Sequence, residues 1–193
     1  MPSSPKVQKE AILKTAFDLL LREGYGAINI KTVATELGCS TQPISRQFGS
    51  MEGFRKELLT YSIAQLKSFF SVKGEHVLEI ISGIAKGYID LAFDFPNLYK
   101  YLYMMEHEEE KMSTLMNYLR SDNYDKIIGK MTGEYGMSEQ FAKECINDLN
   151  FYVHGIASYV AIGYVDASKQ EIMERVQRAN EALLKNRKEM RGE

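Results

Sequence analysis

The chain has 193 residues, of which 45% are hydrophobic and 26% are charged, and its formal net charge is −2. This length can hold one or two compact domains, and the near-neutral charge excludes a histone-like basic protein. No apolar run approaches the roughly 18 residues that cross a bilayer, and the start of the chain, MPSSPKVQKE, lacks the apolar stretch of a signal peptide. The two cysteines, Cys39 and Cys145, lie far apart and suit reduced thiols. We therefore expect a cytoplasmic protein with no membrane partner.

The charge is unevenly distributed along the chain. The first 60 residues carry a net charge of +2, and the remainder carries −4. A mildly basic segment joined to an acidic one suits a small module that contacts phosphates, attached to a domain with another role.

A first helix is predicted over residues 6–22, and Gly24 ends it. Its apolar stripe comprises Ile12, Ala16, Leu19 and Leu20. Residues 29–48, NIKTVATELGCSTQPISRQF, then indicate two short helices joined by a tight turn, because apolar side chains recur at helical spacing. Asn29 is a suitable N-cap for the first of these, and Gly38 follows its last apolar residue, where helices often end in the left-handed conformation. We expect the three helices to pack into one compact unit.

The second short helix is predicted over about 41–48, with Ser40 as its N-cap and Pro43 in its first turn. Ile44 and Phe48 share one face, which we expect to be buried. The other face carries hydrogen-bonding side chains, which suit base edges and phosphates in the major groove of double-stranded DNA. The candidates for DNA contact are Lys31, Ser40, Thr41, Gln42, Ser45, Arg46 and Gln47. A plain corner between two helices, without a role in DNA binding, is the alternative.

The remainder of the chain also has helical spacing. Six more helices are predicted, over residues 51–70, 75–93, 98–107, 111–132, 138–165 and 170–190. Ser50 can cap the first of these, which would connect the N-terminal unit to the remainder. We find no alternation typical of strands, so the predicted fold class is all-α. The predicted domains are residues 1–50 and 51–193, and residues 51–70 form the connecting helix.

Aromatic and methionine residues are frequent, with ten Met, twelve Tyr and nine Phe, and most lie after residue 60. One interpretation is that they fill the core. The other is a ligand pocket, because Tyr places a polar group in an apolar wall and Met adapts its shape. The candidate pocket residues are Phe69, Tyr88, Tyr99, Tyr103, Met104, Tyr118, Phe151, Tyr152 and His154.

The sequence contains no recognisable catalytic motif. The three histidines, His76, His107 and His154, are far apart, and none has a second ligand at metal-binding spacing. Phosphate-binding loops and the nucleophile motif of hydrolases are also missing from the sequence. We therefore predict no enzyme activity, no cofactor and no metal site.

Residues 9–59 resemble the DNA-binding domain of the TetR family of bacterial transcriptional regulators. The resemblance runs without gaps through AILKTAFDLLLREGYGAINIKTVATELGCSTQPISRQFGSMEGFRKELL, including Gly24-Tyr25, Val33-Ala34 and Gly38-Cys39-Ser40. It implies an N-terminal three-helix head that contains a helix-turn-helix, on a larger helical body for ligand binding and dimerisation.

The resemblance also implies a homodimer through the last two helices of each subunit. Residues 138–165 fit this role, since they are apolar on more than one face and include the small residue Gly155. Residues 170–190 offer an apolar stripe made of Ile172, Val176, Ala179 and Leu183.

The chain departs from the family pattern at three positions. The family usually has an aromatic residue where Ser45 stands, a His where Gln47 stands and a Lys where Met51 stands. These differences should weaken non-specific DNA affinity and its salt dependence. Arg46 and Lys31, together with Gln47 itself, are candidates to compensate.

We interpret the sequence as that of a dimeric repressor that binds a pseudo-palindromic operator in double-stranded DNA. A small apolar or aromatic effector, whose identity the sequence does not specify, would release it by favouring one of two states. Two alternatives stay open: a helical dimeric interaction module whose head has lost DNA binding, and a helical enzyme with a buried aromatic pocket.

Overall fold

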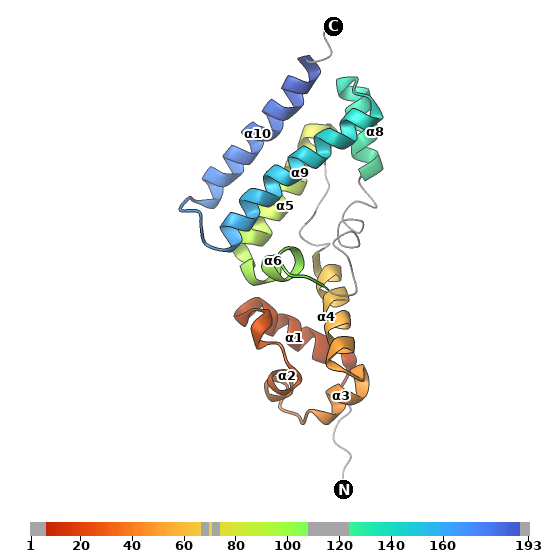
Figure 1. Cartoon of the computed structure of the whole chain (residues 1–193), viewed down its shortest axis with the longest axis vertical. Coiled ribbons are helices and arrows are strands. Elements are labelled where there is room, and N and C mark those ends of the chain that lie inside the picture. Colours follow the sequence, from red (N-terminus) through yellow and green to blue (C-terminus); the bar gives the residue numbers. More distant parts are fainter. Residues whose placement is uncertain (1–6, 67–69, 71–73, 108–123, 190–193) are drawn as a thin grey trace.

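The computed structural model describes residues 7–66, 70, 74–107 and 124–189, with side chains to residue 184 (Figure 1). Within these ranges the chain forms nine α-helices and one 3-10 turn, with no strand, so the all-α prediction is confirmed there. The helices are α1 (Lys9–Glu23), α2 (Ile30–Glu36), α3 (Gln42–Phe48), α4 (Met51–Gln65), α5 (Val77–Asp94), α6 (Pro96–Tyr103), α8 (Tyr124–Tyr135), α9 (Glu139–Ala161) and α10 (Lys169–Glu189).

Helices α1, α2 and α3 pack together at one end of the molecule, and α4 leads from them towards the rest (Figure 1). We call residues 7–50 the head and the remaining described residues the body. The core of the head is fully buried, with Ile12, Val33 and Ile44 each 0% exposed. Phe48 at the end of α3 meets Phe54 on α4 edge to face, with ring centroids 5.0 Å apart. This aromatic contact fastens α3 to the connecting helix.

Local capping explains where two of these helices begin and where one ends. The Asn29 side chain accepts a hydrogen bond from the Thr32 N–H at 3.0 Å, as predicted for the N-cap of α2. Gly38 adopts a φ of 65° after α2, also as predicted. The Ser50 hydroxyl accepts a hydrogen bond from the Gly53 N–H at 3.0 Å and opens α4. Each of these signals lies within three residues of its partner, and so is legible in the sequence.

Helix α6 joins the head to the body. The Asn97 side-chain amide donates to the Leu21 carbonyl at 3.1 Å, close to the end of α1. Tyr25 stacks on Tyr101 with ring centroids 5.0 Å apart and an interplanar angle of 23°. Between these contacts Gly24 has a φ of 83°, and a Cβ there would lie 3.4 Å from the Asn97 side-chain oxygen. The chain therefore needs glycine at this position to bring α1 onto α6.

In the body, α5, α9 and α10 run side by side, and α8 packs at the end remote from the head (Figure 1). Buried apolar residues form two clusters. The first continues from the head through α6 into the adjacent halves of α5 and α9. The second lies between the start of α5, α8, the start of α9 and the far end of α10.

Several predicted helix boundaries differ from the structure. Helix α4 ends at Gln65 rather than residue 70. Helix α8 ends at Tyr135 rather than residue 132, and residues 111–123 of that predicted helix lie outside the described residues.

Helix α6 begins at Pro96 rather than residue 98, because the first turn of a helix does not need the N–H that proline lacks. It ends at Tyr103 rather than residue 107. Helix α9 ends at Ala161 rather than residue 165, and Gly163 then turns the chain with a φ of 74°.

Helix α10 begins at Lys169 through a capping box that the prediction missed. The Ser168 N–H and hydroxyl both donate to the Glu171 carboxylate at 2.7 Å, and these hydrogen bonds hold the pKa of Glu171 below its usual range.

The four residues of the apolar stripe predicted on α10 are not equally exposed, and Ala179 and Leu183 are half-buried. Ile172 and Val176 are only 3% and 1% exposed, so they are buried against their own chain and are not displayed to a partner. The buried stripe continues through Asn180 and Leu184. The amide of Asn180 is 0% exposed and has no hydrogen-bond partner among the described residues. Polar side chains are exposed on the other side of α10, at Glu174, Arg175, Gln177 and Arg178.

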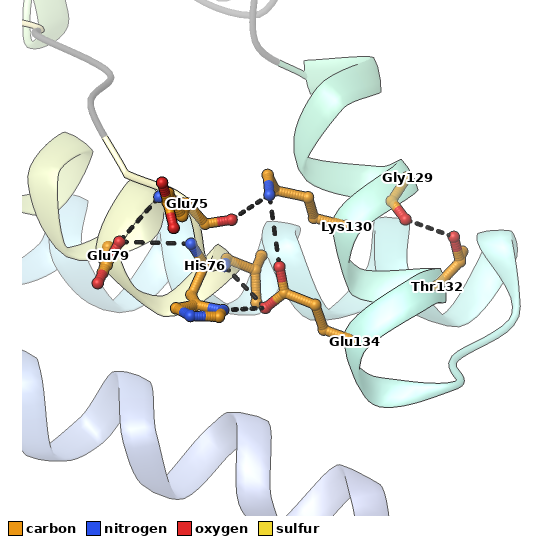
Figure 2. Close-up of polar contacts among 8 residues, drawn as sticks. Glu75, His76, Glu79, Gly129, Lys130, Thr132 and Glu134 are labelled. Carbon is orange, nitrogen blue, oxygen red and sulfur yellow. Dashed lines mark hydrogen bonds and ion pairs between the residues drawn. The ribbon is translucent and has the colours of Figure 1, made fainter.

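Hydrogen bonds and ion pairs connect α8 to the start of α5 (Figure 2). The Glu134 carboxylate accepts a hydrogen bond from the Val77 N–H at 3.0 Å and lies 3.5 Å from Lys130 Nζ, which donates to the Glu75 carbonyl. The Glu79 carboxylate accepts hydrogen bonds from the N–H groups of His76 and Glu75, which lower the pKa of Glu79. These bonds satisfy N–H groups at the start of α5, which have no partner within the helix.

Candidate nucleic-acid interface and body cavity

The side of α3 that faces away from the core carries polar side chains. Gln42, Ser45 and Arg46 are exposed, as predicted, while Ile44 and Phe48 anchor the opposite side in the core of the head. Thr41 precedes the helix and is also exposed. Helices α2 and α3 lie at the end of the molecule farthest from α8 and the C-terminus (Figure 1).

Two features of this surface differ from the prediction. Ser40 does not cap α3: the N-cap position is Thr41, in the αR conformation, and no side chain accepts a hydrogen bond from the helix start. Gln47 is not fully exposed, because its amide donates to the Val7 carbonyl at 2.7 Å. Gln47 thus ties the start of the described chain to α3. Neither fact was legible in the sequence, since the cap depends on backbone conformation and the Gln47 contact joins residues 40 positions apart.

Most basic side chains of the head form ion pairs with acidic residues of the same chain. Lys9 lies 2.6 Å from Glu57, Lys14 lies 2.6 Å from Asp18, and Arg22 contacts Glu23 and Glu36 at 3.1 and 2.9 Å. The exposed exceptions in the described head are Lys31 on α2 and Arg46 on α3, which make no such contact. They are therefore the two cations of the head with no acidic neighbour to displace before meeting a phosphate.

Four of the predicted pocket residues form a packed aromatic cluster between α5, α6 and α9. The Tyr99 ring lies 5.0 Å from that of Tyr103 and 5.9 Å from that of His154, and Tyr103 lies 5.3 Å from Tyr88. The Tyr99 hydroxyl lies 3.0 Å from His154 Nδ1 and 3.3 Å from the Ser158 hydroxyl. Burial raises the pKa values of Tyr99 and Tyr103 well above the usual value of 10, so both hydroxyls stay neutral at physiological pH.

His154 is half-buried in this cluster, and burial lowers its pKa below the usual 6.5. The neutral imidazole can accept a hydrogen bond from the Tyr99 hydroxyl at Nδ1, and the ring then carries no charge in its apolar setting. The unfolded chain binds more protons at this site near pH 6 than the folded chain does. Folding stability therefore falls as the pH drops through about 6.5, towards the lowered pKa of the folded state.

We expect His154→Gln to reduce this loss of stability on acidification. Glutamine keeps a hydrogen-bond acceptor near Tyr99 and cannot gain a charge. Urea midpoints measured at about pH 7.5 and 5.5 should differ less in the variant than in the parent protein. All other ionisable groups are common to the two proteins, so the comparison isolates position 154. An identical pH dependence in the two proteins would mean that His154 titrates with the same pKa folded and unfolded.

The other predicted pocket residues are not part of this cluster. Met104, Phe151 and Tyr152 are 45%, 75% and 38% exposed. Phe69 and Tyr118 lie outside the described residues. The predicted pocket residues that the structure describes are thus divided between a packed cluster and the molecular surface.

A cavity of about 40 Å³ lies beside the aromatic cluster, between α5, α8 and α9. Its walls are mostly aliphatic, and Tyr88 is its one member from the predicted pocket residues. The lining residues are Ile81, Ile84, Ala85, Tyr88, Ile127, Ile146, Leu149, Asn150 and Val153. The aliphatic residues also fit a core helix pattern, so no signal in the sequence distinguishes them as a cavity wall.

Helix α9 presents an exposed apolar stripe over its second half. Phe151, Tyr159 and Ile162 are 75%, 54% and 51% exposed, and Gly155 lies between the first two at helical spacing. Tyr164, just beyond the helix, is 79% exposed, and its ring lies 5.8 Å from that of Tyr159. We call Phe151, Tyr152, Gly155, Tyr159 and Ile162 the α9 stripe. Large exposed apolar patches usually mark contact surfaces.

Among the described residues, no three His, Cys, Asp or Glu side chains are grouped so that they could hold a metal ion. No helix in the same part of the chain has the length and apolarity needed to cross a membrane. No protein-family model matches the chain, and no curated protein matches it.

Proposed function

We propose that the protein is a DNA-binding transcriptional regulator of the TetR family, acting as a dimeric repressor. It would bind a pseudo-palindromic operator and be released by a small apolar or aromatic effector. The observation that carries the proposal is the exposed polar face of α3, with Gln42 and Arg46 on it and Arg46 free of any acidic partner. A helix whose apolar face is buried in the core and whose polar face is exposed can enter a major groove.

The arrangement of α2 and α3 supports a helix-turn-helix. The two helices are joined by residues 37–41, and Gly38 turns the chain between them with a φ of 65°. Ile44 and Phe48 fix the rotation of α3 about its own axis, since both must face the core. In our proposal Gln42 and Arg46 contact bases or phosphates, Lys31 contacts a phosphate, and Thr41 and Ser45 lie beside them.

The α9 stripe supports a dimer. A second copy related by a two-fold axis would place the same residues opposite one another, and Gly155 would allow the two helices to approach closely. The predicted contribution of α10 is smaller than the resemblance implies, because Ile172 and Val176 are buried within the chain. We therefore propose that α9 supplies most of the apolar interface. Two heads held in this way would read two half-sites about one turn of DNA, or a multiple, apart.

Helix α6 is the element through which an effector in the body would act on the head. One side of α6 places Tyr99 and Tyr103 in the aromatic cluster, and the other places Asn97 and Tyr101 against the head. A body state that moves α6 must therefore also move the head or break the stack of Tyr101 on Tyr25. An effector with higher affinity for the state that binds DNA poorly would weaken DNA binding, and DNA would weaken effector binding by the same free energy.

DNA binding by the full chain tests the proposal. We expect Arg46→Ala and Gln42→Ala each to weaken binding to DNA from upstream of the gene by roughly tenfold to a hundredfold, the cost of losing one good base contact. The measurement is fluorescence anisotropy at about 50 and 200 mM salt, because loss of a phosphate contact also lowers the salt dependence by about one charge. Arg178→Ala, at an exposed arginine on α10, is the matched control and should leave binding unchanged.

Two outcomes oppose the proposal. Absence of binding to upstream or random duplexes at the lower salt concentration contradicts a DNA-binding role. If Arg178→Ala weakens DNA binding as much as Arg46→Ala does, α3 is not the recognition surface.

A helical dimeric interaction module is the second candidate function. The observation in its favour is that α3 lacks an aromatic residue at Ser45, while Gln47 donates to Val7 and is partly unavailable for DNA. Such a module would dimerise through the α9 stripe without binding duplexes, so the same anisotropy experiment separates the two candidates.

A further inference from the structure

The chemistry of the cavity between α5, α8 and α9 restricts what it can hold. Seven of its nine lining side chains are aliphatic, and none is charged. Burying a charged group against such walls would cost several kcal/mol, because nothing there replaces its water. A charged ligand is therefore excluded from the wall contacts.

Asn150 supplies a polar group to this otherwise apolar wall. Its side chain is half-buried and makes no hydrogen bond to any described residue. An amide offers both a donor and an acceptor, so Asn150 is the one cavity-lining side chain apart from Tyr88 that can hydrogen-bond a ligand. A ligand hydroxyl or carbonyl that reaches Asn150 can form a hydrogen bond with its amide while the rest of the ligand contacts the aliphatic walls.

The volume of the cavity favours a slim ligand. It measures about 40 Å³, far below the roughly 150 Å³ of an apolar cavity known to bind benzene, so a molecule the size of benzene or n-butanol enters fully only if the walls move. A flexible aliphatic chain can follow a narrow space by rotation about its bonds, whereas a rigid ring needs the full width at once. The walls also lack the aromatic faces against which a ring would stack, apart from Tyr88, which already packs on Tyr103.

We propose that this cavity binds an uncharged, slim aliphatic molecule that carries one hydroxyl or carbonyl group, and that Asn150 holds that group. The inference deepens the proposed function, on which it rests only in naming this molecule as the effector class. It narrows the effector from apolar or aromatic to aliphatic.

The position of the cavity suits regulation of the head. Tyr88 lines the cavity and packs on Tyr103, which lies on α6. Helix α6 in turn contacts the head through Asn97 and Tyr101. A ligand that displaces Tyr88 therefore acts on a continuous series of contacts that ends at α1 and Tyr25.

The test uses n-butanol as the probe, with butanoate and benzyl alcohol for comparison, and the full chain labelled at its isoleucine methyl groups. We expect n-butanol to shift the NMR signals of Ile81, Ile84, Ile127 and Ile146 in a saturable manner and to leave Ile12 in the head unchanged. Butanoate, which is charged at neutral pH, and benzyl alcohol should bind at least tenfold more weakly.

Two variants test the role of Asn150. Asn150→Leu, which conserves size, should weaken n-butanol binding about tenfold by removing the hydrogen bond. Asn180→Leu is the matched control, since Asn180 is also an unpaired amide but does not line the cavity, and n-butanol affinity should be unchanged. Equal affinity in the parent and Asn150→Leu, no saturable shift at these methyl groups, or tighter binding of butanoate or benzyl alcohol would each overturn the inference.

The NMR titration contains no DNA, so its result does not depend on the proposed function. If n-butanol fills the cavity while DNA affinity is absent, the regulator proposal fails and the cavity assignment holds. If the protein binds DNA but no probe enters the cavity, the cavity assignment fails alone.

Discussion

Gly53→Ala is expected to destabilise the protein by about 2 kcal/mol or more, although alanine is the better helix former. A Cβ at Gly53 would lie 2.4 Å from the carbonyl oxygen of Phe48. This oxygen belongs to the backbone at the end of α3 and also accepts a hydrogen bond from the Ser50 N–H at 2.8 Å, so it cannot rotate away as a side chain would. Relief of the clash requires α3 and α4 to separate, which also strains the contact between Phe48 and Phe54.

Urea denaturation followed by circular dichroism measures this effect. Gly129→Ala is the matched control, because Gly129 lies within α8 and no atom comes within 4 Å of its added Cβ. The free energy of unfolding of that variant should be about 0.5 to 1 kcal/mol higher, because alanine has the higher helix propensity. The two substitutions are thus expected to have opposite signs. If Gly53→Ala is as stable as the parent, the close approach of α3 to α4 does not occur in solution.

Phe151→Glu is expected to weaken self-association about a hundredfold or more. Phe151 is 75% exposed in the single chain and lies on the α9 stripe, where a large aromatic side chain is a typical interface anchor. Glutamate at this position would remove that anchor and would bury a carboxylate between two copies of the same helix, facing its own counterpart. A loss of about 2.8 kcal/mol corresponds to the hundredfold change.

Sedimentation equilibrium over a range of protein concentrations measures the dissociation constant. Ala64→Glu adds the same charge at an exposed apolar position on α4, outside the α9 stripe, and the dissociation constant should be unchanged in this control. A dimer that survives Phe151→Glu would place the interface elsewhere, and a parent protein that is monomeric at all concentrations would contradict the dimer. In the proposed regulator the monomeric variant also loses operator affinity, since one head contacts only one half-site.

The sequence located many helix ends from local signals, although the Ser40 cap predicted for α3 does not form and the capping box of Ser168 and Glu171 was missed. The caps at Asn29 and Ser50, the turn at Gly38 and the burial of Ile44 and Phe48 all followed from residues within about one helical turn of each other. Helix boundaries around α6 were less accurate, because Pro96 was interpreted as a stop when it starts the helix.

The candidate sites were only partly predictable. The exposure of Gln42, Ser45 and Arg46 followed from the helical period of α3, so the outward face was correctly predicted. The contact of Gln47 with Val7 was missed, since it joins segments that the sequence does not relate. Aromatic content suggested the pocket residues, but the cavity has aliphatic walls that resemble any other core.

By itself, the sequence determined the all-α class, the two short helices of the head and the outward face of α3, because caps, glycine turns and apolar periodicity act between residues close in the chain. Only the tertiary structure decided which side of α10 is buried, how Asn97 and Tyr101 dock the head on α6, and where the cavity lies. These features depend on the relative placement of helices far apart in the chain. That placement results from the simultaneous packing of many side chains, and no short stretch of sequence contains it.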